Sequence, residues 1–221
     1  MLLPARRSAL VAGLFLLGAC ADAPTLAPEL PVEAAASRGP LKALPSIGEI
    51  AVAAATDPNP AAREFTQLVA ALQYVDAAEQ TRLVELFVNG TGQRTVFAPT
   101  DAAFRRLYAL ASDLLGTTID EITDLPSALV LKVLLYHVTD GRRGANSVLP
   151  TQGVRTIETL GGSTFQVTPS GEILDALMAA MVPNARIVTA DIPASNGVVH
   201  VIDQVLLPPS VVTVLLPPGM P

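Results

Sequence analysis

TVFAPTDAAF, residues 95–104, is the segment from which the fold of this chain is best predicted. Its first four residues predict a short buried strand, because β-branched and aromatic residues favour strands. Pro99 ends that strand, and Thr100 or Asp101 can cap the helix that follows to Leu110. Two of its side chains are expected in the core, those of Phe97 and Phe104. The stretch therefore predicts a buried strand that leads directly into a helix.

A second stretch, NGVVHVID at residues 196–203, predicts the closing strand of the domain. Its first two residues, Asn196-Gly197, favour a tight hairpin turn before a strongly β-prone run. His200 alternates with two valines, and a histidine in that setting is more often a hydrogen-bonded structural residue than a ligand. The same interpretation is favoured for Tyr136-His137 in LLYHVTDG, residues 134–141.

The rest of the chain alternates helical and β-prone patterns, without an internal repeat. Helices are predicted over residues 47–55, 64–75, 76–87 and 173–182, and a short helix or turn over 112–119. A helix followed by a strand is predicted over 125–138, with Asp124 or Ser127 as its cap. Short strands are predicted over 148–167, 186–190 and 198–207, and the Pro-rich end, 209–221, is expected to be a frayed strand or disordered.

These motifs and their order resemble the fasciclin domain over residues 47–208. The resemblance implies a single α+β domain, a wedge of short β-strands with a cluster of α-helices over one side. It also implies binding without catalysis and without an obligatory cofactor. The positions that match the family motifs, mainly structural ones, are Thr95, Phe97, Pro99, Thr100, Asp101, Phe104, Tyr136, His137, Asn196, Gly197 and His200.

The resemblance further implies a partner-binding pair, Asp191-Ile192, just before the second motif. In animal relatives an Asp-Ile pair in this loop is associated with integrin recognition. The structural alternative is that Asp191 caps a turn and Ile192 fills the core. No Arg-Gly-Asp triplet occurs in the chain.

Residues 1–19 have the three parts of an export signal. Arg6-Arg7 precede an apolar run that is too short to span a membrane, and the small pair Gly18-Ala19 comes before a cleavage site. The sequence around Cys20 is similar to a bacterial lipobox, which implies a diacylglyceryl group on its thiol and an acyl chain such as palmitate on its amine. The alternative is a plain secretory signal in which Cys20 has no role.

A lipid at Cys20 would anchor the protein in the cell envelope, because two or more acyl chains give stable membrane attachment. Ala21 follows Cys20 where an Asp would stand in some retained lipoproteins, which resembles the pattern of an outer-membrane destination. Residues 20–46 are rich in Ala and Pro, and Pro favours extended, semi-rigid chain. They are interpreted as a tether between the lipid and the domain, rather than as a structured subdomain.

Composition argues against several classes of function. The net charge is −6, there is no Trp, and only nine residues are Phe or Tyr, so neither a basic patch nor a stacking surface for nucleic acid is predicted. Two arginine pairs, Arg105-Arg106 and Arg142-Arg143, are interpreted as solvated surface. Two histidines and a lone cysteine cannot make an ordinary zinc site without carboxylates. No catalytic motif is present, although the 20 acids leave a carboxylate pair open.

The sequence therefore predicts a lipid-anchored, non-catalytic module that binds an extracellular or envelope protein or a polysaccharide. The first alternative is a structural envelope lipoprotein that contacts peptidoglycan or other envelope proteins. The second is a small-molecule binder or enzyme, which would require a deep pocket with convergent polar groups.

Overall fold

The computed structural model describes residues 44–176 and 183–215, and Lys42–Pro221 form one compact unit. The helices in the described part are α1 (Ile47–Ala55), α2 (Thr66–Glu79), α3 (Leu83–Asn89), α4 (Asp101–Leu115), α5 (Ser127–Tyr136), α6 (Ala145–Val148) and α7 (Pro209–Leu215), with a 3₁₀ turn, η2 (Ile122–Asp124). The strands are β1 (Arg94–Pro99), β2 (Val138–Asp140), β3 (Arg155–Glu158), β4 (Thr164–Val167), β5 (Glu172–Leu174), β6 (Ala185–Ala194) and β7 (Gly197–Ile202).

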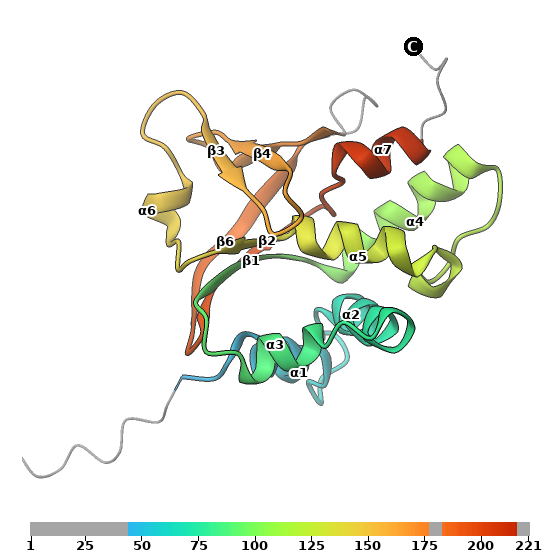
Figure 1. Cartoon of the computed structure of the whole chain (residues 1–221), viewed down its shortest axis with the longest axis horizontal. Helices are drawn as coiled ribbons and strands as arrows, with labels where there is room; N and C mark the ends of the chain where they lie inside the picture. The colour runs from blue at the N-terminus through green and yellow to red at the C-terminus, as the bar shows by residue number, and fades with distance from the viewer. Residues whose placement is uncertain (1–43, 177–182, 216–221) are drawn as a thin grey trace, which may run out of the picture. The chain divides into compact units, whose positions relative to one another are not determined.

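The seven strands form one sheet in the order β2-β1-β7-β6-β5-β4-β3. The pairing of β1 with β7 is parallel, and the other pairings are antiparallel. The sheet curls so that its two ends meet: the backbone N–H of Leu160 donates to the carbonyl of Val138 over 2.7 Å, and the Thr139 hydroxyl donates to the carbonyl of Glu158 over 2.6 Å. In Figure 1, β3 and β4 accordingly fold back over β1 and β2.

Two apolar cores result from this arrangement. The smaller lies inside the curled sheet, where the rings of Phe97, Tyr136 and Phe165 pack edge to face with centroids 5.0 and 5.7 Å apart. The larger lies between the sheet and the helices. α1, α2 and α3 lie together on one side, and α4, α5 and α7 form a second group (Figure 1). The expected α+β wedge with its cluster of helices is confirmed.

Local capping explains where several helices begin. Ser46 and Glu49 form a capping box at α1, with the Ser46 N–H donating to Glu49 Oε2 over 2.7 Å. The Thr100 hydroxyl accepts from the N–H of Ala103 and caps α4, as the sequence predicts. The Asp101 carboxylate instead accepts from the N–H of Gln67, over 2.9 Å, near the start of α2. Asp101 therefore joins two helices that are far apart in the sequence.

Several local predictions are wrong. The helix predicted over 76–87 is interrupted, because α2 ends at Glu79 and α3 begins at Leu83, and the last strand ends at Ile202 instead of 207. α4 continues to Leu115, so no separate element begins at residue 112. α5 begins after Pro126 without a side-chain cap. Residues 172–174 are strand β5, because Ile173 fills the core inside the curled sheet; the rest of the predicted 173–182 helix, from 177 onward, lies outside the described residues. Residues 209–215 are helix α7, since Val211 and Leu215 bury against the larger core.

The turn between β6 and β7 is fixed from both sides. The buried side chain of Asn196 accepts from the N–H of Ile47 and donates to the carbonyl of Phe87, each over 2.9 Å, and so ties the turn to α1 and α3. A Cβ on Gly197 would lie 1.9 Å from the carbonyl oxygen of Arg94. Only glycine therefore lets β7 approach the start of β1 this closely.

His137 is buried at the C-terminal end of α5, and its ring joins that helix to the segment after β7. Its Nε2 accepts from the N–H of Leu206 over 2.9 Å, which leaves Nδ1 to donate to the carbonyl of Val133 over 2.7 Å. Burial lowers the pKa of His137 to about 4, although the hydrogen bond to Val133 acts in the opposite direction. The predicted structural role of this histidine matches these contacts.

We expect Gly197→Ala to lower the free energy of unfolding by about 3 kcal/mol or more, because the new methyl fits only if β1 and β7 separate. Urea denaturation measures the loss. Gly153→Ala is the matched control: Gly153 also has a backbone that disfavours other residues, with φ 67°, but a Cβ there meets nothing within 4 Å. That control should cost only about 1 kcal/mol, and equal losses in the two variants would contradict the close-approach explanation.

The pKa of His137 predicts a loss of stability in mild acid. Between about pH 6.5 and pH 4 the unfolded chain binds a proton at His137 and the folded chain does not. The contribution of His137 to stability is therefore complete above about pH 6.5 and falls as pH drops toward 4, by up to about 3 kcal/mol. Urea denaturation at pH 7 and pH 4.5 should show this slope, and His137→Gln should flatten it. A His200→Gln variant, measured in the same way, is the comparison for the other buried histidine. An unchanged slope in His137→Gln would refute the assignment of the pH-dependent stability to His137.

Candidate functional site

The two motifs meet on the parallel strands β1 and β7. Thr95 pairs with Val198 and Phe97 with His200 in the register of these strands. The fully buried Thr95 hydroxyl donates to the carbonyl of Gly141 and accepts from the N–H of Arg143, each over 2.8 Å. The first motif therefore holds the loop that follows β2.

His200 holds the same loop from the other strand. Its fully buried ring lies 5.4 Å from that of Phe97, centroid to centroid. Nδ1 accepts from the N–H of Asp191 over 3.3 Å, which places the ring proton on Nε2, and Nε2 donates to the carbonyl of Arg143 over 2.9 Å. His200 thus joins β6 to the loop after β2, and its side chain is engaged on both nitrogens.

Asp191 lies in an irregular part of β6, where the register with β7 shifts between Thr189 and Ile192. Its φ of 62° is left-handed, a conformation that Asp tolerates better than most residues. The exposed carboxylate accepts from the N–H of Ala145 over 2.7 Å through Oδ1 and so caps α6. No hydrogen bond to Oδ2 is present in the described part of the chain.

Ile192 is half-buried and packs against the larger core. The contacts of Asp191 and Ile192 are those of the structural alternative, a turn cap and a core residue. They also bring Asp191 to the surface, and the role of the pair in partner binding stays a prediction. We name residues 141–145 and 188–193 together the bulge surface.

The Arg142-Arg143 pair is more than solvated surface, in contrast to the sequence interpretation. The Arg142 guanidinium donates to the carbonyl of Ala194 over 2.9 Å and to Gln93 Oε1 over 3.3 Å. The Arg143 backbone is held by Thr95 and His200. The sequence offered one signal for this, the position of the pair directly after the Asp140-Gly141 turn.

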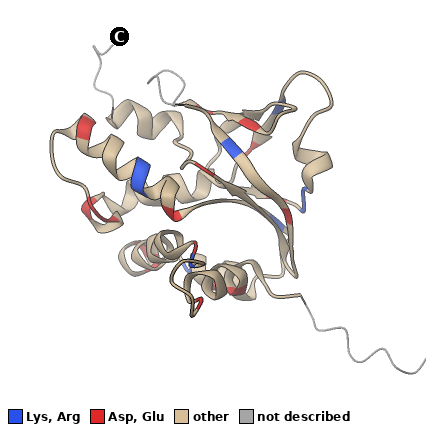
Figure 2. Cartoon of the chain, turned by 180° about the vertical axis from the view of Figure 1, so that it is seen from behind, with Lys and Arg blue, Asp and Glu red and all other residues tan. Residues whose placement is uncertain are grey.

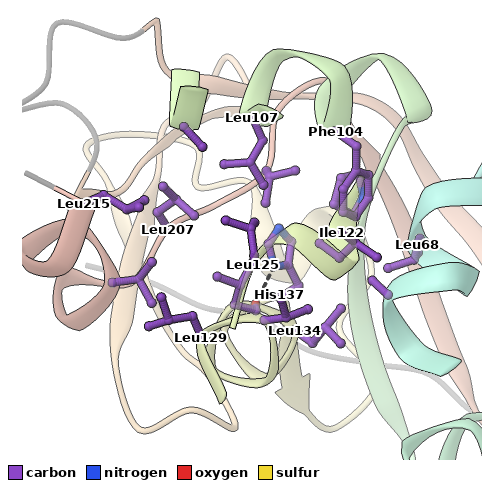
Figure 3. Close-up of a pocket in the computed structure, with 17 residues that line it drawn as sticks. Leu68, Phe104, Leu107, Ile122, Leu125, Leu129, Leu134, His137, Leu207 and Leu215 are labelled. Carbon is purple, nitrogen blue, oxygen red and sulfur yellow. Dashed lines mark hydrogen bonds between the residues drawn. The ribbon is translucent and has the colours of Figure 1, made fainter. Parts of the chain in front are cut away.

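Two interior cavities are too small for a ligand. One, of about 30 Å³, lies between α2, α4, α5 and α7, and Figure 3 shows the leucines that surround it, with the His137–Val133 hydrogen bond at its wall. The other, of about 40 Å³, lies beneath α1. A cavity needs a volume of about 10–15 Å³ to hold a single water molecule. Each cavity therefore has room for only a few waters between mainly apolar side chains, and neither is a ligand site.

Within residues 44–176 and 183–215, no group of three or more His, Cys, Asp or Glu side chains is placed to hold a metal ion. No helix of that part is long and apolar enough to cross a membrane. Seen from behind, acidic and basic segments are interspersed over helices and sheet (Figure 2). Cys20 lies outside the described residues.

Comparison with known proteins supports the motif-based assignment. The model of the "Fasciclin domain" family matches residues 63–208. The chain is 37% identical over 161 residues to "Immunogenic protein MPT70" of Mycobacterium tuberculosis, which covers 73% of this chain and 69% of that protein. It is 35% identical over 147 residues to "Protein sll1483" of Synechocystis sp., covering 66% and 68%.

A third relative is "Cell surface glycolipoprotein MPB83" of Mycobacterium bovis, 36% identical over 124 residues, which are 56% of this chain and 47% of that protein. Among solved structures, the chain is similar to a FAS1 domain pair from the insect cell adhesion molecule Fasciclin I, with a TM-score of 0.41 and 17% identity over 63% of this chain and 45% of that chain. The family model matches more than half of this chain, and a relative above 30% identity matches it over more than two thirds of the relative's own length. The chain therefore belongs to the fasciclin domain family.

Proposed function

We propose that this protein is a lipid-anchored module of a bacterial cell envelope that binds an extracellular protein or polysaccharide without catalysis. The observation that carries the proposal is the internal engagement of the motif side chains. Thr95, His137 and His200 are buried and fully hydrogen-bonded within the fold. These groups support a rigid surface, which suits recognition of a partner better than reaction chemistry.

We favour the bulge surface as the contact site, because buried motif side chains hold it from inside the domain. Asp191 presents its carboxylate there, and the neighbouring Val188 is 55% exposed. Thr95 and His200 hold the loop on one side and the strand on the other. Because both sides are fixed before a partner arrives, binding would cost little conformational entropy.

Relatives support an envelope location, since one of them is a mycobacterial cell-surface glycolipoprotein. The lipid anchor itself rests on the lipobox-like sequence before Cys20, and the outer-membrane destination rests on Ala21. A structural lipoprotein of the envelope would share this anchor. The two roles differ in which side of the membrane the domain faces, and protease treatment of intact cells distinguishes them.

We expect cells that express the full chain to incorporate labelled palmitate into it and to retain it in the membrane fraction. The Cys20→Ser variant should carry no label, because the thiol is the acceptor of the diacylglyceryl group. Gel autoradiography and cell fractionation measure both effects. Label that persists in Cys20→Ser, or wild-type protein without label, would refute the lipid anchor.

The charge of Asp191 gives a test of the contact surface. Asn tolerates a left-handed backbone and can still accept from Ala145, so Asp191→Asn removes the charge and keeps the local fold. We expect it to weaken saturable binding of the full chain to its ligand, found on an array of matrix proteins, envelope extracts and polysaccharides, by about tenfold.

Asp113→Asn, which removes an exposed charge on α4, is the control and should bind like the wild type. Binding that survives Asp191→Asn would keep the adhesive function and move its site elsewhere. A wild-type chain that binds nothing on the array would count against an adhesive module and favour the structural lipoprotein.

A further inference from the structure

A surface groove of about 460 Å³ lies between α4 and the adjoining ends of β6 and β7. None of its lining residues belongs to the bulge surface. One wall is aliphatic and is formed by Leu107, Leu110 and Val205, while the rim carries Arg106 and Arg186. A volume of this size lies in the range of sites for small ligands and peptide ends.

The rim of the groove is held by hydrogen bonds to the backbone. The Arg106 guanidinium donates to the carbonyl of Asp203 over 2.6 Å, and Asp203 Oδ1 accepts from the N–H of Arg186 over 2.7 Å. Gln204 donates from Nε2 to the carbonyls of Pro183 and Asn184. The walls of the groove are therefore positioned independently of any ligand.

In the described part of the chain, neither guanidinium group of the groove lies at salt-bridge distance from a carboxylate, although the Asp203 carboxylate also lines the groove. Within the described residues, the ion pair at salt-bridge distance joins Arg94 to Asp140, on other strands. The side chain of Arg186 is exposed and makes no hydrogen bond in that part of the chain. In a protein of net charge −6, the lining of this groove holds two arginines and one acid, Asp203, so the groove has a net charge of +1 beside an aliphatic wall.

The hydrogen-bond acceptors at the rim of the groove restrict the chemical class of the ligand further. The amide oxygens of Asn184 and Gln204 accept no hydrogen bond within the described part, since both side chains act there only as donors. Guanidinium forks suit a carboxylate, amide oxygens suit peptide N–H groups, and the wall suits an aliphatic side chain. Among the residues that the structure describes, no aromatic side chain lines the groove to stack against a sugar ring.

We propose that this groove binds the C-terminal end of a peptide chain whose last residue is aliphatic. Arg106 and Arg186 bind the terminal carboxylate, Asn184 and Gln204 accept from the last peptide N–H groups, and the side chain contacts Leu110 and its neighbours. The groove and the bulge surface share no residues, so the assignment stands or fails independently of the adhesive function and the lipid anchor.

Calorimetric titration of the full chain in mild detergent tests the assignment. The probe is an acetylated tetrapeptide that ends in Ala-Leu with a free carboxylate, and its comparators are the same peptide as the amide, and acetyl-leucine. We expect the free acid to bind at least tenfold more tightly than the amide and than acetyl-leucine. Arg186→Gln should weaken its binding at least tenfold without loss of fold, because that guanidinium makes no hydrogen bond to the described residues.

Arg105→Gln is the matched control, since Arg105 is the exposed neighbour of Arg106 on α4 and does not line the groove. It should bind the peptide like the wild type, whereas Arg106→Gln should weaken binding. Equal affinity for acid and amide, no effect of Arg186→Gln, an equal effect of Arg105→Gln, or no binding of the tetrapeptide would each overturn the proposal. Acetyl-leucine that binds as tightly as the tetrapeptide would show a site for small carboxylic acids and would overturn the peptide assignment.

Discussion

The parallel pairing of β1 with β7 is the constraint on which the rest of this structure depends. The two strands are about a hundred residues apart in the chain, and their register from Arg94–Gly197 to Pro99–Ile202 brings both family motifs side by side. That register depends on the missing side chain of Gly197, where any Cβ would meet the backbone of β1. Once the strands are paired, Phe97 lies beside His200 and the small core inside the curled sheet can close. The turn, the core and the loop after β2 all follow from one close approach.

Buried polar groups then make the arrangement specific. Thr95 and Asn196 each make two hydrogen bonds to elements that are distant in sequence, and His200 makes one to the distant Arg143 and one to Asp191 on the neighbouring strand β6. A shift of one residue in register would leave these groups buried without partners, which costs about 1–3 kcal/mol for each group. These residues therefore specify one register, which explains why motifs rich in Thr, Asn and His mark the fold rather than a reaction.

Much of the fold could be predicted from the sequence, because the deciding signals are local. The Thr100 cap of α4, the strand that ends at Pro99 and the Asn196-Gly197 turn all act over a few residues. The failures have long-range causes. Helix α7 begins at the second proline of Pro208-Pro209, and it forms because the core accepts Val211 and Leu215. The irregular register of β6 is equally invisible in the sequence, since it is set by contacts of Asp191 with His200 and with α6. Positions of candidate site residues could be named in advance, but not the surfaces they share.

The left-handed backbone at Asp191 connects the scaffold to the surface. In an extended strand this residue would place its carboxylate elsewhere, and α6 would lose the acceptor for Ala145. Strain of this kind persists only where neighbouring contacts determine the conformation, and here His200 supplies that contact from inside the fold. The second motif is therefore coupled to the exposed loop through one buried ring. A partner that contacts this surface meets a shape set by the core, so substitutions in the interior at Phe97 or His200 should alter recognition without contacting the partner.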